Sequence, residues 1–176
     1  MKLLLKNIDG IRIPERAHDD DAGYDIFTVL DPLVTGVNEE GKLIKNGEAK
    51  GLWRRVDFIE YRTNLFWTPE AEKHIEIFPR SSLSKYNLLL CNSVGTIDTG
   101  YTGEILCRFR YIWQPEDLRV VPFQGIMGWI NIEKIYKNGD AIAQMKGRDN
   151  VSLEFEFVNE LGETKRADGG FGSSKK

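Results

Sequence analysis

The sequence predicts an all-β protein, a sandwich or barrel built of many short strands. Segments in which apolar and polar residues alternate recur along the 176 residues, and a two-residue period is that of a half-buried strand. Glycine, proline, asparagine and aspartate separate these segments, as they do in turns between strands. No segment has the period of a long amphipathic helix. Together these observations favour an all-β architecture.

The strands are predicted in order along the chain. The clearest is 105–113, whose odd-numbered residues are apolar while Arg108 and Arg110 share the other face. Residues 151–157 alternate as cleanly and are predicted as the last strand. A composition change then divides an all-β domain, 1–158, from a flexible glycine-rich tail, 159–176. The other predicted strands are 2–7, 26–29, 42–44, 51–59, 74–78, 88–91 and 141–145.

Two further segments are predicted not to be strands. The segment Pro79–Leu83 breaks the preceding strand, and Ser81 or Ser82 could cap a short helix ending at Lys85. Residues 115–128 contain prolines and glycines and are predicted to be irregular.

Composition restricts the function. The net charge is −3 with charges of both signs interspersed, whereas a duplex-DNA-binding domain is usually basic. No apolar run reaches the ~18 residues that a membrane span needs, and the first residues are too short for a secretory signal. We therefore expect a cytoplasmic protein that binds neither nucleic acid nor membrane. In a reducing cytosol Cys91 and Cys107 are expected to be free, buried thiols.

The segment 88–113 is predicted to be a β-hairpin whose turn contains Asn92, Asp98 and Tyr101 among three glycines. Glycine lets the backbone approach a ligand closely, and that backbone offers donors and acceptors. Such a hairpin could contact the edge of a flat polar ring, with Asp98 beside it for chemistry. The alternative is that these are ordinary turn residues and that the tyrosine packs.

Five short segments stand out in order along the chain: Asp21-Ala-Gly-Tyr-Asp25, Pro79-Arg-Ser-Ser-Leu83, residues 92–105, Gly139-Asp-Ala-Ile-Ala-Gln-Met145 and residues 166–174. In this order they resemble the motifs of the trimeric dUTPase (deoxyuridine triphosphate nucleotidohydrolase) family. The resemblance spans residues 21–174, and the order of five short motifs makes it specific. Ala141, Ala167 and Ser174 depart from the residues common in the family, and the distance from Asp98 to Gln144 is long for it.

This resemblance implies a jelly-roll-like fold and a homotrimer with active sites at subunit interfaces. It implies hydrolysis of dUTP to dUMP and pyrophosphate, assisted by Mg²⁺. In the family's pattern Asp98 positions the attacking water, and Asp25 lies near an ion held mainly by substrate phosphates. Asp25 could instead pair with an arginine.

The resemblance also assigns binding residues. Those for uracil and deoxyribose are Asn92, Gly95, Ile97, Tyr101 and Phe171, with Tyr101 excluding a ribose 2′-hydroxyl. Those for the phosphates are Arg80, Ser81, Ser82, Gln144, Arg166, Gly172, Ser173 and Ser174. The tail, with Phe171 on the uracil ring, is expected to close over a site built by neighbouring chains.

Two other functions remain open. A deaminase of related fold acting on dCTP would need a catalytic glutamate, and Glu104 is the only one in the hairpin. A dUTPase-like protein could also bind a regulatory protein through the long segment 113–129, which is otherwise a longer surface loop.

Overall fold

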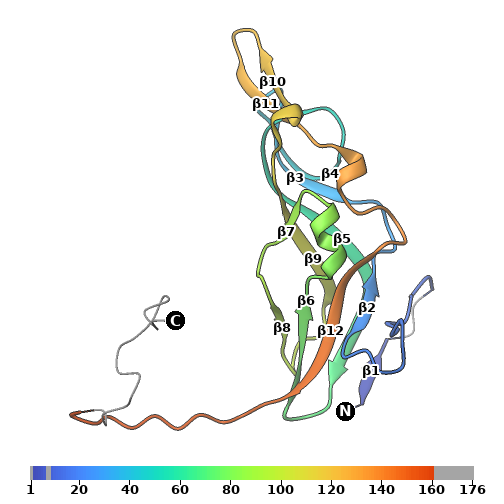
Figure 1. The fold of residues 1–176 in the computed structure, drawn as a ribbon, viewed down its shortest axis with the longest axis vertical. Helices are drawn as coiled ribbons and strands as arrows, with labels where there is room; N and C mark the ends of the chain where they lie inside the picture. The colour runs from blue at the N-terminus through green and yellow to red at the C-terminus, as the bar shows by residue number, and fades with distance from the viewer. Residues whose placement is uncertain (1, 7–8, 161–176) are drawn as a thin grey trace, which may run out of the picture.

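The computed structural model describes residues 2–6 and 9–160, and within these ranges it contains no α-helix. Twelve strands form two antiparallel sheets, and three short 3₁₀-helices connect them (Figure 1). No described helix is long and apolar enough to cross a membrane. The predicted all-β fold is confirmed.

The larger sheet is organised around β5 (Leu52–Pro69), which pairs with β1, β3, β9 and β11. The predicted strand ended at residue 59, but the structure continues it to Pro69 because aromatic and β-branched residues go on alternating between buried and half-buried positions. The other strands of this sheet are β1 (Leu3–Leu5), β3 (Leu33–Asn38), β4 (Leu43–Glu48), β7 (Leu88–Leu90), β9 (Glu104–Tyr111), β10 (Leu118–Val121) and β11 (Gly125–Trp129).

The smaller sheet has the strand order β2-β12-β6-β8. Its members are β2 (Tyr24–Phe27), β12 (Ala141–Asp149), β6 (Lys73–Phe78) and β8 (Gly95–Ile97). The predicted hairpin is present, because β7 pairs with β9 in the large sheet. Its connecting segment contains a further strand, β8, which pairs with β6 in the small sheet. The segment thus links both sheets.

The core lies between the two sheets. Ile26, Ile75 and Ile142 of the small sheet are fully buried, as are Tyr61 and Phe109 of the large one. The rings of Tyr61 and Phe109 meet edge to face at 5.5 Å between centroids. Each buried side chain of this size contributes roughly 1.5–3 kcal/mol to stability, so the predicted alternation supplies the apolar faces that hold the sandwich together.

The 3₁₀-helices are η1 (Ser81–Lys85), η2 (Pro115–Asp117) and η3 (Ile132–Lys134). The short helix predicted at 81–85 is confirmed, but the predicted serine cap is wrong. Arg80 occupies the cap position, and no side chain makes a capping hydrogen bond. The backbone turn closes instead through the Leu83 amide, which donates to the Arg80 carbonyl at 3.0 Å.

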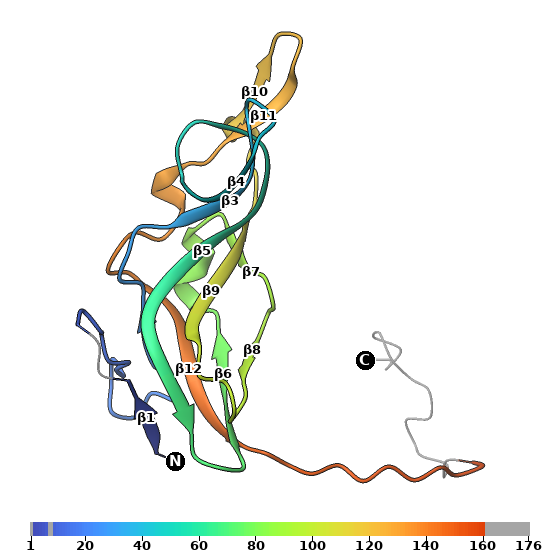
Figure 2. The same ribbon diagram turned by 180° about the vertical axis from the view of Figure 1, so that it is seen from behind.

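The prediction of irregular structure at 115–128 is wrong. Strands β10 and β11 form a hairpin that projects from one end of the molecule (Figures 1 and 2). Apolar residues spaced two apart favour this hairpin, and Phe123 and Gly125, both at positive φ, make its turn.

The prediction of a strand at 151–157 is also wrong for the single chain. The chain leaves β12 at Asp149 and runs away from the sandwich as an extended arm (Figures 1 and 2). Residues 151–158 pair with no described strand, and Phe155 and Phe157 are almost fully exposed. Alternation supplies an apolar face, but a strand also needs a neighbour for its backbone hydrogen bonds. We call residues 150–158 the arm.

Both cysteines are free, as predicted, but only Cys107 is buried. Burial raises the pKa of the Cys107 thiol to about 12, so this side chain is an inert part of the core. Cys91 is exposed, because it follows β7 at the point where the chain leaves the sheet.

Candidate active site

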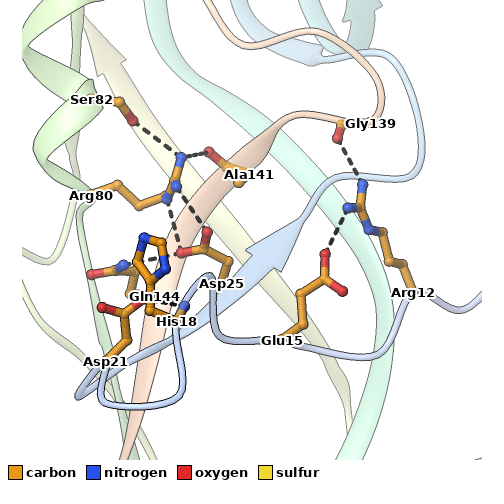
Figure 3. A network of polar contacts seen from close by, with 10 residues as sticks. All are labelled: Arg12, Glu15, His18, Asp21, Asp25, Arg80, Ser82, Gly139, Ala141 and Gln144. Carbon is orange, nitrogen blue, oxygen red and sulfur yellow. Dashed lines mark hydrogen bonds and ion pairs between the residues drawn. The ribbon is translucent and has the colours of Figure 1, made fainter.

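A part-buried ion pair joins the first two motifs, and a hydrogen bond from Gln144 adds the fourth. Arg80 contacts Asp25 with two parallel hydrogen bonds, Nη2 to Oδ2 at 2.8 Å and Nε to Oδ1 at 3.0 Å (Figure 3). Gln144 Nε2 donates to Asp25 Oδ1 at 3.0 Å. We call Asp25, Arg80, Ser82 and Gln144 the Arg80 cluster.

Sheet register explains how these residues meet. Gln144 of β12 lies opposite Asp25 of β2 on one side and opposite Phe78 of β6 on the other. Arg80 follows β6 by two residues, so its long side chain reaches across to β2. Its Nη1 atom also donates to Ser82 Oγ and to the Ala141 carbonyl, both at 3.3 Å (Figure 3).

The Arg80 cluster contains one carboxylate and one cation, and the cation is the more accessible of the two. Arg80 pairs with Asp25 in a bidentate contact; the Asp25 side chain is 10% exposed and the Arg80 side chain is 27% exposed. Asp25 is therefore the anchor of the pair, and Arg80 is the residue with surface left to meet a phosphate. Ser81 is exposed beside it at the start of η1.

Below η1, Tyr86 packs on Tyr136 at 4.3 Å between ring centroids. Tyr136 is buried, and desolvation raises the pKa of its hydroxyl to about 12. Because Tyr86 directly follows η1, this ring contact anchors the end of the segment that carries Arg80, Ser81 and Ser82.

The fit of a magnesium ion depends on Asp25. No group of three or more His, Cys, Asp and Glu side chains in residues 2–6 and 9–160 could hold a metal. The oxygens of Asp25 accept hydrogen bonds from Arg80 and Gln144, so Asp25 is poorly suited to bind an ion directly. It fits an outer role, in contact with the water of an ion held mainly by phosphates.

A pocket of about 370 Å³ lies beside the hairpin. Three of the residues predicted to bind the nucleoside, Asn92, Ile97 and Tyr101, line it together. A fourth, Gly95, leaves room for the Asn92 amide, since a Cβ at Gly95 would lie only 2.8 Å from Asn92 Nδ2. Any larger residue at this position would displace the amide.

The pocket also has lining residues that sequence reasoning did not assign to it: Cys91, Glu104, Ile105, Leu106 and Arg108. The sequence contained part of the signal for these residues, because the alternation of β9 places Leu106 and Arg108 on the face opposite the core. It did not show that the hairpin turn folds over that face and makes it one side of a pocket. Burial raises the pKa of Cys91 against the opposing effect of two nearby arginines, so the thiol at the pocket wall is not an activated nucleophile.

Asp98 is exposed and follows β8 directly. Its backbone is held on both sides: its carbonyl accepts from the Tyr101 amide at 3.0 Å, and Thr99 is fixed by two hydrogen bonds. Thr99 Oγ1 donates to the Lys73 carbonyl at 2.6 Å, and Thr68 Oγ1 donates to the Thr99 carbonyl at 2.7 Å. The carboxylate thus stands on a fixed loop with its oxygens open to solvent.

Tyr101 folds back over the turn. Its hydroxyl donates to the Glu104 carbonyl at 2.9 Å, and the residue is 44% exposed. A Cβ at Gly103 would lie 2.5 Å from the hydroxyl oxygen, so only glycine allows this conformation. The ring therefore forms one wall of the pocket.

One chain brings the predicted residues together in two places, not one. The Arg80 cluster lies around β2 and β12, whereas the pocket lies beyond β8, at the opposite edge of the small sheet. Three inter-strand spacings of ~4.8 Å separate β2 from β8, about 14 Å in all. The predicted tail residues Arg166, Phe171, Gly172, Ser173 and Ser174 lie outside the described residues.

Comparison with known proteins places these features in a family. No family model matches the chain. The deoxyuridine 5′-triphosphate nucleotidohydrolase of Clostridium acetobutylicum is 32% identical over 176 residues, which cover 99% of this chain and 97% of that protein. The enzyme of the same name from Clostridium novyi is 35% identical over 179 residues, 99% of each protein.

Solved structures share the fold. The dUTPase of Staphylococcus bacteriophage 80alpha with dUPNHPP superposes with a TM-score of 0.68 at 21% identity, over 99% of each chain. A mutant dUTPase from phage phi11 of S. aureus, which coordinates a structural Mg(II) ion, superposes with a TM-score of 0.60 at 21% identity, over 92% of this chain and 99% of that one. With full-length relatives above 30% identity and the same sandwich, the chain belongs to the deoxyuridine 5′-triphosphate nucleotidohydrolase (dUTPase) family.

Proposed function

We propose that the protein hydrolyses dUTP to dUMP and pyrophosphate with the help of Mg²⁺, which lowers dUTP and supplies dUMP for thymidylate synthesis. The observation that carries this proposal is the 370 Å³ pocket in which Asn92, Ile97 and Tyr101 converge. The family resemblance assigns all three of these residues to the nucleoside. Asp98 follows Ile97 directly on the same fixed loop.

The pocket suits uracil by its hydrogen-bonding pattern. Uracil presents an acceptor, a donor and an acceptor on one edge, and the Asn92 amide with nearby backbone groups can match this pattern. Cytosine changes two of these three groups, and each unpaired buried group costs roughly 1–3 kcal/mol. Two mismatches give about 10²- to 10⁴-fold discrimination at ~1.4 kcal/mol per decade.

Asp98 acts as the general base. Its carboxylate orients a water molecule and accepts a proton as the water oxygen attacks the α-phosphorus in line. The bond from that phosphorus to the bridging oxygen breaks, and pyrophosphate leaves with the electron pair. Positioning and electrostatics dominate such transfers, which is consistent with a carboxylate held on a braced loop.

The triphosphate is bound by Arg80, Ser81, Ser82 and Gln144. Arg80 offers its partly exposed side chain, and the buried Asp25 orients it. When bound to the phosphates, Mg²⁺ neutralises part of their charge, with Asp25 in its outer shell. The tail residues, Phe171 on the base and Arg166 with the serines on the terminal phosphate, complete the proposed site.

The assembly is a homotrimer with sites between subunits. Two observations support this proposal. The phosphate-binding cluster and the nucleoside pocket lie at opposite edges of the small sheet in one chain, so a complete site needs groups from another copy. The arm exposes Leu153, Phe155 and Phe157, and a neighbouring copy would cover this apolar face.

The function is tested by measuring pyrophosphate release from dUTP, dCTP, dTTP and UTP with Mg²⁺. We expect turnover of dUTP at least about 10²-fold above the others. Ammonia release is measured from dCTP in parallel. Ammonia without pyrophosphate would instead support the dCTP deaminase alternative and contradict the proposal.

The sugar wall makes a separate prediction. Removing the Tyr101 ring opens space for a 2′-hydroxyl, so Tyr101→Ala should raise kcat/KM for UTP relative to dUTP by about tenfold or more. Tyr101→Phe, the matched control, keeps the ring and should keep most of the discrimination. If Tyr101→Ala hydrolyses UTP no better than the parent does, Tyr101 does not exclude ribose.

A second candidate function is binding of a regulatory protein through the β10–β11 hairpin, within the predicted segment 113–129. The observation that favours it is a group of exposed apolar residues far from the pocket: Val120 is 81% exposed, Ile126 66%, and Phe123 at the tip is fully exposed. Val120 and Ile126 are a cross-strand pair on one face. Exposed apolar groups of this kind mark interaction surfaces.

This role predicts that the hairpin is separable from catalysis. A variant with Val120, Phe123 and Ile126 replaced by serine should keep its kcat/KM for dUTP within about twofold and its mass in solution. A change in mass would assign the hairpin to the homotrimer, and a fall in kcat/KM would assign it to the active site. Either result would contradict a separate protein-binding role.

A further inference from the structure

Strand β5 has an irregularity opposite the beginning of β9. The register passes from Arg62 opposite Leu106 to Phe66 opposite Glu104, so residues 63–65 of β5 face Ile105 alone and β5 has two extra residues. Such a bulge removes backbone amides from the regular ladder. Because the segment is buried or half-buried, each of these amides needs another acceptor.

Side chains accept from all three amides of the bulge. Glu104 Oε1 accepts from the Thr63 amide at 3.2 Å and from the Asn64 amide at 3.1 Å. Thr63 Oγ1 accepts from the Leu65 amide at 3.1 Å and donates to the Ile105 carbonyl at 2.7 Å. Asn64 has a φ of 53°, a left-handed conformation that needs such support in a residue other than glycine.

Glu104 also holds the Tyr101 wall of the pocket, through its main chain. Its main-chain carbonyl accepts the hydrogen bond from the Tyr101 hydroxyl at 2.9 Å. Glu104 also lines the pocket with Tyr101, Asn92 and Ile97. Its side chain is only 11% exposed, and Arg62 Nη2 is its cationic partner at 3.3 Å.

We propose that Glu104 is a positioning residue that sets the shape of the nucleoside pocket, by fixing the Tyr101 ring to the bulge of β5. This inference rests on the proposed function of the pocket. Glu104 is not a catalytic residue, because it acts through Tyr101. With the carboxylate bound to the bulge, the beginning of β9 is fixed, and so is the carbonyl that holds Tyr101. Without it, two buried amides lose their acceptor, and the turn carrying Tyr101 loses its support.

The charge and the acceptor atom have separable roles. Gln at position 104 keeps an Oε1 atom that can accept from both amides, while Ala keeps neither acceptor nor charge. Arg62 touches the carboxylate from the surface, and an exposed partner of this kind contributes little. The positioning role therefore predicts that Glu104→Gln is mild, Glu104→Ala is severe and Arg62→Ala is close to neutral.

The test uses the full chain with the variants Glu104→Ala, Glu104→Gln and Arg62→Ala. Steady-state kinetics are measured with dUTP and UTP, and dUMP binding is measured by calorimetry. For Glu104→Ala we expect KM for dUTP and Kd for dUMP to rise roughly tenfold, as for loss of a charged hydrogen-bonding group. We expect the preference for dUTP over UTP to fall by a similar factor and kcat to change by less than about threefold.

Amide hydrogen exchange supplies a readout independent of turnover. In Glu104→Ala the amides of Thr63 and Asn64 should exchange at least about tenfold faster, and in Glu104→Gln they should remain protected. Unchanged sugar preference and unchanged dUMP binding in Glu104→Ala would overturn the inference, even if its melting temperature fell, because the role would then be structural only. Absence of dUTP hydrolysis by the parent would contradict the proposed function instead, since dUMP binding and exchange need no turnover.

Discussion

Asp98→Asn should lower kcat for dUTP hydrolysis by roughly 10²- to 10⁴-fold, the usual contribution of a general base. The amide has the same shape as the carboxylate but cannot accept the proton from the attacking water. Folding should be unaffected, because the exposed Asp98 side chain accepts no hydrogen bond from the described residues and the loop is held through its backbone and through Thr99.

The measurement is pyrophosphate release at saturating dUTP, with KM determined in the same series. Asp9→Asn, which changes an exposed turn carboxylate elsewhere, is the matched control and should keep parental activity. A variant of Asp98 that retained parental kcat would exclude this residue as the base, whereas a rise in KM alone would make it a binding residue.

Arg80→Ala should have the largest effect on stability. It leaves the Asp25 carboxylate, 10% exposed, with Gln144 as its hydrogen-bonding partner and no cation. Breaking a buried pair in this way typically costs about 3–5 kcal/mol. The free energy of unfolding is measured by urea denaturation at one fixed protein concentration, because assembly makes apparent stability depend on concentration.

Two control variants separate the loss of an ion pair from the cost of a buried, unpaired charge. Arg148→Ala removes a half-exposed pair with Glu76 and should cost only about 0–1 kcal/mol. The double variant Asp25→Asn with Arg80→Ala removes the uncompensated charge, so it should recover part of the stability but none of the phosphate binding. If Arg80→Ala were as stable as Arg148→Ala, the buried pair would not hold the three strands together.

The all-β sandwich could be predicted because the alternation that produces its buried faces is visible within single segments of the sequence. In β9 the alternation of Ile105, Cys107 and Phe109 with two arginines determines which face is buried, whatever lies opposite. The family motifs likewise identified Asn92, Ile97 and Tyr101, and the structure places these three around one pocket.

Other features depended on partners that no local pattern shows. Residues 151–157 alternate as cleanly as β9, yet the arm has no strand beside it in its own chain. The sequence indicated no structural role for Glu104, because the bulge that it supports is formed about 40 residues earlier in the chain. The segment 115–128 was predicted to be irregular from its prolines and glycines. In the structure some of these residues lie at or near the turn of the β10–β11 hairpin, whose strand pairing no local pattern shows.

The sequence by itself determined the fold class and the buried faces, since these follow from side-chain type and a two-residue period, and its motifs supplied the candidate site residues. Only the tertiary structure decided which of those residues meet. It joined Asp25, Arg80 and Gln144 through strand register, and it placed the nucleoside pocket at the opposite edge of the small sheet. The physical reason is that register and strand order are set by long-range backbone pairing, which leaves no mark on any single segment.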